Sequence, residues 1–319
     1  MPFLKKFAAT LAAVCLCAAL VPYLAAQEPE PGQTLKATVN LVNLYVTVRD
    51  NKKHIVTNLT QNDFSVFEDN QPQKIAFFSK EVTLPITLGL LLDTSGSEQN
   101  MLYAIQDAGS QFLGRVLRKG DEAMIISFDT DVNLMADFTD NRGELDRAIH
   151  RTRISAPMGG MVNPGPIGSG NTTGTALYDA IYLACHDQLA TEAGRKAIVI
   201  VTDAEDEGSK VRIEEAIEAA QRTDTVIHII LVYDPRYGAN TGAARKLTEE
   251  TGGRVISATS AKKLQEAFDE ISEELRSQYT VGYYPSNTAH DGQFRKVKVE
   301  MANKDDKALT RKGYYAPKS

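Results

Sequence analysis

Hydrophobic and polar residues alternate with period two in two separate parts of this 319-residue sequence. The first part covers residues 39–78, where one face of the leading run is formed by Val42, Leu44, Val46 and Val48. Asp50-Asn51 and Asp69-Asn70 interrupt this part as turns. The alternation returns after Gln278, in residues 279–283, 297–301 and 313–315. Period two is typical of strands with one buried face, so both parts predict short antiparallel strands.

Between these two parts the pattern changes. Residues 86–92, Ile-Thr-Leu-Gly-Leu-Leu-Leu, are nearly continuously apolar, which is typical of a strand buried on both faces of a parallel sheet. Helical and strand patterns then alternate, with helices predicted around residues 101–116, 177–184, 213–220 and 264–275 and strands at 123–128, 196–201 and 226–232. This alternation predicts an α/β fold with a doubly wound, mainly parallel sheet.

Neither flank of this α/β segment contains enough strands to cover its own apolar face, and small isolated sheets are only marginally stable. We therefore expect the flanks, residues 35–83 and 277–319, to be the two halves of one small discontinuous antiparallel β domain. The α/β domain, residues 84–276, would be inserted between them.

The start of the chain has the pattern of a secretory signal peptide over residues 1–26, with Lys5 and Lys6 before an apolar stretch and Leu24-Ala25-Ala26 as a cleavage site. Residues 27–34 are polar and rich in proline, as in a flexible leader. We expect a secreted or periplasmic protein without a transmembrane segment in the mature chain, because the apolar stretch is too short to span a membrane. Cys15 and Cys17 would be lost with the peptide, which leaves Cys185 as a small buried hydrophobe.

Charge argues against nucleic acid as a partner. The full chain has a formal net charge of −6, and removal of Lys5 and Lys6 makes the mature chain more negative, which repels phosphate backbones. Nucleotide binding is not expected either. Residues 155–174 are rich in glycine and proline, but they lack the lysine and the strand-to-helix context of a P-loop.

Oxygen-bearing side chains follow two of the predicted central strands. Asp93, Ser95 and Ser97 come directly after the strand at residues 86–92, and Asp203 closes the strand at residues 198–202. Thr175 precedes a predicted helix. The carboxyl edge of a doubly wound sheet is where ligands bind, so these three loops could converge there. Hydroxyl and carboxylate oxygens are hard ligands that suit Mg²⁺, Ca²⁺ or Mn²⁺ better than zinc or copper.

This set of residues resembles the metal-ion-dependent adhesion site (MIDAS) of von Willebrand factor type A (VWA) domains, and the resemblance covers roughly residues 84–276. It implies a Rossmann-like VWA fold in which Ser95, Ser97 and Thr175 offer hydroxyls to a divalent metal while Asp93 and Asp203 act directly or through water. The flanking segments 62–69, 283–285 and 311–315 are similar to those of exported VWFA-related proteins of Acidobacteria.

The resemblance also implies protein binding or cell adhesion without catalysis. A divalent ion with mostly neutral ligands stays electron-poor, so it prefers an acidic side chain from a protein partner as its last ligand. We expect Gly174, Ala204 and Glu205 to contact that partner. Many family members have glycine where this sequence has Ala204, so the loop after Asp203 departs from the family pattern at this position.

Several alternatives stay open. A strand can simply end in a polar turn with an N-capping residue, which would make the protein a metal-free scaffold of the cell envelope. A metal-dependent hydrolase is the second alternative, although no general base stands out. The acidic run Glu205-Asp206-Glu207 could extend the metal site or could complement a helix dipole. An intracellular assembly subunit of the VWA type does not agree with a signal peptide.

Overall fold

The computed structural model describes residues 41–80, 84–154, 174–236 and 238–318. The predicted signal peptide and leader lie outside these residues, as does almost all of the loop at 155–174. In the described part of the chain, none of the helices has the length and apolar character needed to cross a membrane.

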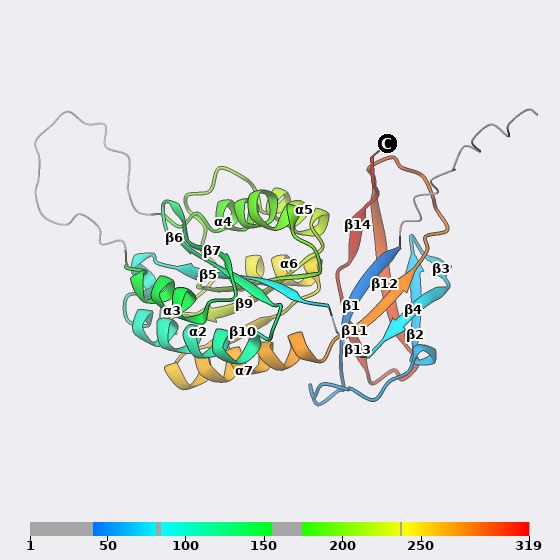
Figure 1. Cartoon of the computed structure of the whole chain (residues 1–319), viewed down its shortest axis with the longest axis horizontal. Helices are drawn as coiled ribbons and strands as arrows, with labels where there is room; N and C mark the ends of the chain where they lie inside the picture. The colour runs from blue at the N-terminus through cyan, green and yellow to red at the C-terminus, as the bar shows by residue number, and fades with distance from the viewer. Residues whose placement is uncertain (1–40, 81–83, 155–173, 237, 319) are drawn as a thin grey trace, which may run out of the picture. The chain divides into compact units, whose positions relative to one another are not determined.

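A six-stranded sheet forms the α/β part of the molecule, in the strand order β10-β9-β8-β5-β6-β7 (Figure 1). The strands are β5 (Ile86–Asp93), β6 (Glu122–Phe128), β7 (Val132–Thr139), β8 (Arg195–Thr202), β9 (Thr225–Val232) and β10 (Val255–Ala258). All neighbouring pairs are parallel except β6 with β7. Every residue of β5 and β9 is buried, as the nearly continuous apolar pattern at residues 86–92 predicts for β5.

Helices cover both faces of this sheet. Two separate hydrophobic cores lie against it, one beneath α2 (Leu102–Val116), α3 (Arg142–Arg151) and α7 (Ala261–Arg276), the other beneath α4 (Leu177–Leu183), α5 (Ile213–Arg222) and α6 (Thr241–Thr251). Along β5, Leu90 and Leu92 belong to the first core and Leu91 to the second. The predicted doubly wound α/β fold is therefore confirmed.

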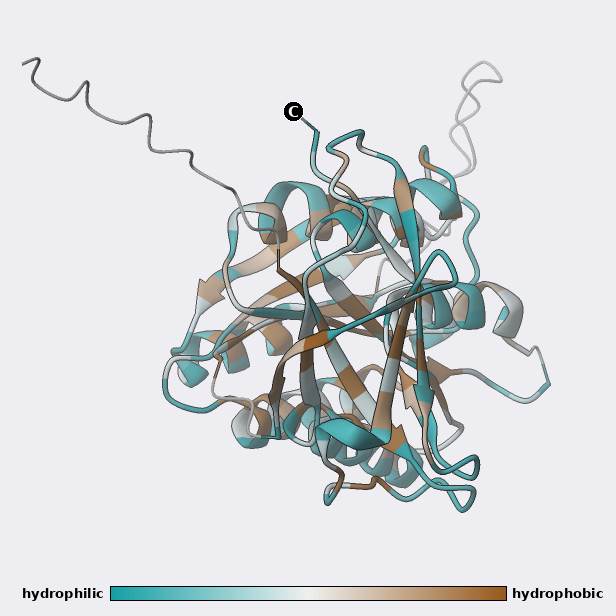
Figure 2. Ribbon diagram, turned by 90° about the vertical axis from the view of Figure 1, so that its right-hand side faces the viewer, coloured by the Kyte–Doolittle hydropathy of each residue, from teal (hydrophilic) through white to brown (hydrophobic). Residues whose placement is uncertain are grey.

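The flanking segments form two antiparallel sheets of four strands each, in the orders β13-β1-β11-β4 and β14-β12-β2-β3. Their strands are β1 (Val42–Arg49), β2 (Phe64–Glu68), β3 (Gln71–Gln73), β4 (Ile75–Ser79), β11 (Tyr279–Tyr283), β12 (Phe294–Met301), β13 (Lys307–Leu309) and β14 (Gly313–Tyr315). Both sheets combine strands from before and after the α/β segment, and they share one hydrophobic core (Figure 2). The alternation in β1 has the expected consequence, because Val42, Leu44, Val46 and Val48 are all buried in this core.

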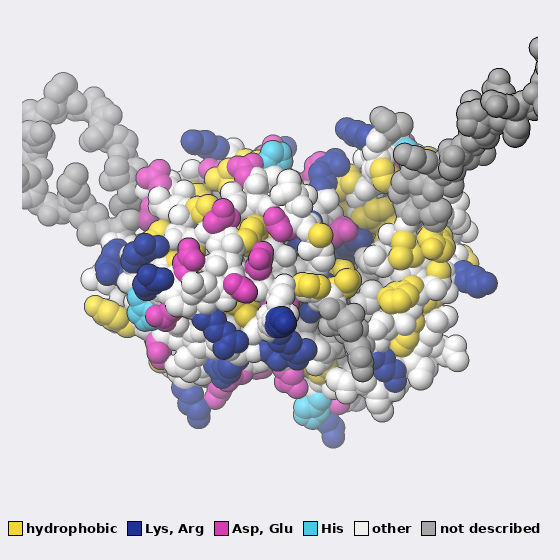
Figure 3. Space-filling model, in the orientation of Figure 1, with side chains coloured by type: hydrophobic (Ala, Val, Ile, Leu, Met, Phe, Trp, Pro, Cys, Tyr) yellow, Lys and Arg dark blue, Asp and Glu magenta, His cyan; other side chains and the backbone are white. Residues whose placement is uncertain are grey.

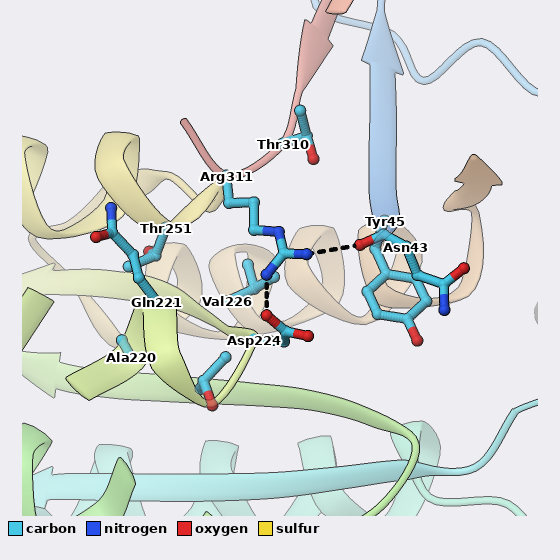
Figure 4. A pocket seen from close by; sticks show the side chains of 10 residues that line it. Asn43, Tyr45, Ala220, Gln221, Asp224, Val226, Thr251, Thr310 and Arg311 are labelled. Carbon is cyan, nitrogen blue, oxygen red and sulfur yellow. Dashed lines mark hydrogen bonds and ion pairs between the residues drawn. The ribbon is translucent and has the colours of Figure 1, made fainter. Parts of the chain in front are cut away.

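Partly buried ion pairs join the antiparallel strands to the amino ends of the parallel ones. Arg311, between β13 and β14, pairs with Asp224 just before β9 and donates to the carbonyl of Asn43 in β1 (Figure 4). Arg49 of β1 pairs at 2.6 Å with the fully buried Glu274 of α7. These contacts lie at the amino end of the parallel strands, opposite to the carboxyl end at which doubly wound sheets bind ligands.

Backbone also approaches backbone closely at this junction. Gly252 ends α6 with φ +90°, and a Cβ built there would lie 2.4 Å from the backbone nitrogen of Arg311. Only glycine accommodates both the left-handed conformation and this contact. The cavity beside Arg311 has a volume of about 10 Å³, enough for about one water and too small for an organic ligand.

Candidate metal-binding site

Asp93 is the last residue of β5, and its neighbours fix its carboxylate firmly. Its side chain is fully buried, its Oδ1 accepts a 2.9 Å hydrogen bond from the backbone nitrogen of Ser95, and its Oδ2 accepts a 2.5 Å bond from the Thr202 hydroxyl. Because β5 pairs directly with β8, the two strands bring these residues to the same edge of the sheet. Burial is the main cause that raises the pKa of Asp93 to about 6, and the nearby carboxylate of Asp203 adds to it.

Ser95 and Ser97 follow on a turn that reverses the chain. Gly96–Glu98 form a single 3₁₀ turn, η2, and the two serine hydroxyl oxygens lie 3.0 Å apart. Ser95 is half-buried and Ser97 is exposed, so this pair of hydroxyls lies at the boundary between the protein and solvent.

Thr175 and Asp203 lie on loops that hydrogen bonds connect. The carbonyl of Thr175 accepts bonds from the backbone nitrogens of Glu207 and Gly208, at 3.1 and 3.2 Å. The backbone nitrogen of the next residue, Ala176, donates at 2.6 Å to the carbonyl of Asp129, which follows β6. The loop that carries Thr175 is thereby fixed between the ends of β6 and β8.

The carboxylates at this edge form a close group. Asp93, Glu98 and Asp203 each offer an oxygen, and these three oxygens lie within 4.8 Å of one another. Calcium binds oxygen at about 2.3–2.6 Å, so ligands on opposite sides of one ion are about 4.6–5.2 Å apart. A single divalent ion could therefore contact all three residues.

Glu98 is the member of this group that the sequence analysis missed. Its side chain is 1% exposed, and among the described residues neither of its carboxyl oxygens has a hydrogen-bond partner. Burial, then the carboxylates of Asp93 and Asp203, raise its pKa to about 9. The available signal was its place directly after Ser97, but the surrounding turn of polar residues predicts an exposed side chain rather than a buried one.

Ala204 stands where the resemblance leads one to expect glycine. Its φ is +62°, in the left-handed region that favours glycine, and its side chain is fully buried. Its backbone nitrogen donates a 3.0 Å bond to the Thr202 hydroxyl, which in turn donates to Asp93. The loop therefore adopts the conformation that glycine would favour, with alanine in that position.

The other predicted partner-binding residues surround this loop. Gly174 lies against the backbone of Glu207 and Gly208, and Glu205 is exposed. Within the acidic run, Asp206 accepts bonds from the backbone nitrogen of Tyr178 in α4 and from the Ser209 hydroxyl. Asp206 thus complements the amino end of a helix, as one of the two sequence-based interpretations expects.

The donor set suits a hard divalent cation. The grouped carboxylates and the neighbouring hydroxyls all offer oxygen ligands, and Glu98 is a buried acid that accepts no hydrogen bond from a described residue. Imidazole and thiol ligands lie elsewhere: His228 is buried near Glu274, and Cys185 is buried in the core beneath α4, where burial raises its pKa to about 12. Asp93 and Asp203 are thus brought together, whereas ligand roles for Ser95, Ser97 and Thr175 stay predictions.

The visible face of the molecule shows no large field of a single charge. In Figure 3, acidic and basic side chains are interspersed over the helical part, and hydrophobic side chains are more frequent over the antiparallel strands. On this face there is no continuous basic surface of the kind that nucleic-acid binding requires.

Comparison with known proteins supports the assignment of this segment. Residues 88–206 match the family model of the von Willebrand factor type A domain, a stretch from β5 to the loop after β8 that includes all five predicted metal ligands. No curated protein matches the chain at a significant level.

Solved structures show the same fold at low sequence identity. Proximal thread matrix protein 1 of the mussel byssus is 13% identical, with a TM-score of 0.52 over 66% of this chain and 51% of the mussel protein. The form of that protein with a zinc-occupied MIDAS motif gives 14% identity and a TM-score of 0.50, over 65% and 49% of the two chains. The match thus spans about half of the mussel protein.

Bacterial structures are also similar. BatB of Bacteroides thetaiotaomicron is 19% identical, with a TM-score of 0.46 over 60% of this chain and 100% of BatB. A von Willebrand factor type A protein of Catenulispora acidiphila is 12% identical, with a TM-score of 0.49 over 89% of this chain and 75% of that protein. The resemblance of the flanks to proteins of Acidobacteria stays a prediction.

Proposed function

We propose that this chain is an exported, non-catalytic binding protein whose VWA segment binds a divalent metal and, through it, an acidic side chain of a protein partner. The match to the VWA family over residues 88–206 is the premise. The observation that carries the proposal is the group of oxygens from Asp93, Glu98 and Asp203 within 4.8 Å at the carboxyl edge of the sheet.

The predicted ligands would have different roles in binding the metal, and these roles follow from their environments. Asp93 and Asp203 supply negative charge, and Asp93 is oriented by the Thr202 hydroxyl and the backbone of Ser95. Ser95, Ser97 and Thr175 add neutral hydroxyl oxygens. When bound, the metal supplies an electrophilic centre at the surface that attracts an oxygen ligand from another molecule. Ser97 and Glu205 are exposed beside it and are placed to contact that molecule.

We favour Mg²⁺ or Ca²⁺, with Mn²⁺ as a further possibility, because carboxylate and hydroxyl ligands suit these ions. The zinc in the mussel protein belongs to that protein's MIDAS motif. Export follows from the signal-peptide pattern of residues 1–26, so the natural setting of the site would be the periplasm or the exterior of the cell. Extracellular calcium and magnesium would be available to it there.

The experiment is a calorimetric titration of residues 27–319 with Mg²⁺, Ca²⁺ and Mn²⁺, comparing the wild type with Asp93→Ala. A ligand that binds only the native state raises the melting temperature by mass action. We expect saturable binding and a metal-dependent rise of the melting temperature in the wild type, both absent in Asp93→Ala. If the wild type binds none of the three ions, the metal-free scaffold is the better description.

This titration does not distinguish the proposed binding protein from a metal-dependent hydrolase, because a hydrolase would bind metal as well. The same preparations should therefore be incubated with chromogenic carboxylic and phosphate esters. We expect no turnover with any ion. Turnover that needs metal and disappears in Asp203→Ala would replace the proposed binding function with catalysis.

A further inference from the structure

Glu98 is a buried acid to which the described part of the chain offers no hydrogen-bond donor. It ends the η2 turn, one residue after Ser97, with 1% of its side chain exposed. Neither carboxyl oxygen has a hydrogen-bond partner among the residues that the structure describes. A carboxyl group removed from water without a compensating bond is costly, whether it is charged or neutral.

Asp93 provides a contrast within the same site. Its two oxygens each accept a hydrogen bond, one from the backbone of Ser95 and one from the hydroxyl of Thr202. The protein therefore orients Asp93 by itself. The Glu98 carboxyl accepts no hydrogen bond from any residue that the structure describes, although its oxygen lies within 4.8 Å of oxygens from both Asp93 and Asp203.

The charges around Glu98 make the arrangement more unfavourable still. The two charged groups that act on it are both carboxylates, and like charges in a buried site repel strongly. A divalent cation at the point that the three oxygens share would satisfy the unpartnered carboxyl and would turn the repulsion into attraction.

We propose that Glu98 is a third carboxylate ligand of the metal, supplied by the chain itself. This inference rests on the proposed metal-binding function. Three carboxylates carry more negative charge than a divalent ion carries positive charge, so the loaded site would retain its metal tightly. It would also attract a further carboxylate only weakly. An acidic side chain from a partner would therefore have to displace Glu98 before it could bind the metal.

The test uses Mn²⁺ as the probe, because both its affinity and the number of its bound waters can be measured. The variants are Glu98→Gln, which keeps the shape without the charge, and Glu98→Ala, which leaves the position to solvent. Asp107→Asn is the matched control, since Asp107 is an exposed acid on α2 outside the group. Glu98→Met serves as a second neutral variant of similar length.

We expect Glu98→Gln and Glu98→Ala to bind Mn²⁺ at least tenfold more weakly than the wild type and the Asp107→Asn control. Water-proton relaxation should show at least one additional water on the Mn²⁺ of Glu98→Ala. Added acetate should remove that water in Glu98→Ala and leave the wild type unchanged. Without metal, Glu98→Met should melt no lower than the wild type, because it keeps the length of the side chain and lacks the unpartnered buried acid.

The results separate the two proposals. Equal Mn²⁺ affinity and equal water number in the wild type and all three Glu98 variants would overturn the role of Glu98 and leave the metal site intact. A wild type that binds no metal would overturn both proposals.

Discussion

The Oδ2 of Asp93 accepts a hydrogen bond of 2.5 Å from the hydroxyl of Thr202. The bond joins the last residues of two parallel strands, β5 and β8, inside the protein, where both side chains are fully buried. The same hydroxyl accepts a bond from the backbone of Ala204. One threonine thus orients both the first carboxylate of the site and the loop that carries Asp203.

Replacement of Thr202 by valine should separate this role from packing, because the two side chains have nearly the same shape. It leaves a buried oxygen of Asp93 and the backbone nitrogen of Ala204 without a partner, which costs about 1–3 kcal/mol for each group. We expect the free energy of unfolding in urea to fall by about 2–6 kcal/mol on this basis. Metal affinity should fall as well.

The control for this change is Thr259→Val, at an exposed position after β10. Thr259→Val should alter neither the free energy of unfolding nor the metal affinity. If Thr202→Val binds metal with the affinity of the wild type, the orientation of Asp93 is not set by this hydrogen bond.

The metal-free protein should lose stability as pH rises. The pKa of Asp93 is raised to about 6 and that of Glu98 to about 9, so the folded state binds more protons than the unfolded state between about pH 4 and pH 9. This contribution to stability is complete below about pH 4 and is lost as pH rises through the two folded pKa values. Metal should reverse the trend, because it favours the ionised carboxyls.

Melting temperatures measured from pH 5 to pH 9, in chelator and in calcium, check this prediction. Glu98→Gln should flatten the decline in chelator above pH 7. A metal-free melting temperature that is the same at pH 6 and pH 9 would contradict the raised pKa of Glu98.

Ala204 should tolerate glycine and reject larger residues. At φ +62° a β-branched side chain is strongly strained, and this position is also fully buried. We expect Ala204→Val to lower the free energy of unfolding by about 2 kcal/mol or more, in keeping with the cost of a strained backbone. In Ala204→Gly the relief of strain should offset the loss of a buried methyl group, which leaves stability nearly unchanged. Urea unfolding of both variants measures the difference.

Glu274 should be far more important for stability than its neighbour Glu270, although both pair with Arg254. Glu274 is fully buried and also pairs with Arg49, whereas Glu270 is exposed. Removal of one partner from a buried ion pair typically costs about 3–5 kcal/mol, because the remaining charge stays desolvated. We expect Glu274→Ala to show a loss of this size in chemical unfolding, and Glu270→Ala to remain close to the wild type.

The sequence predicts the strands better than the connections between them. The apolar run of β5 and the alternation of β1 are uninterrupted, and both predictions are confirmed. The strand β7 was missed because it lies at the edge of the sheet, with polar and apolar residues in no regular order, VNLMADFT. The elements α3, α6 and β10 were not predicted either. The three-residue strand β13 is too short to show any period.

At the site, the motif identified residues on three separate loops, and the structure brings Asp93 and Asp203 together. The motif could not identify the side-chain contacts that orient these residues. Thr202 looks like the end of a buried strand in the sequence, and only the pairing of β5 with β8 shows that it bonds to Asp93. Burial of Glu98 depends in the same way on the packing around η2. Pairing and burial of this kind are properties of the folded chain, which local sequence patterns do not report.

The two antiparallel sheets have a consequence for how the chain reaches its native state. Each contains strands from both flanks, and the Tyr279 hydroxyl donates to the carbonyl of Val56, 223 residues away in the sequence. Contacts at such separation form late, because a long loop must close before they add stability. During synthesis, β1 and β4 would thus wait without β11, and β2 would have only β3 beside it, until the last forty residues or so have been added. Their apolar faces would need protection in that interval, and a chain that ends after α7 would leave both sheets incomplete.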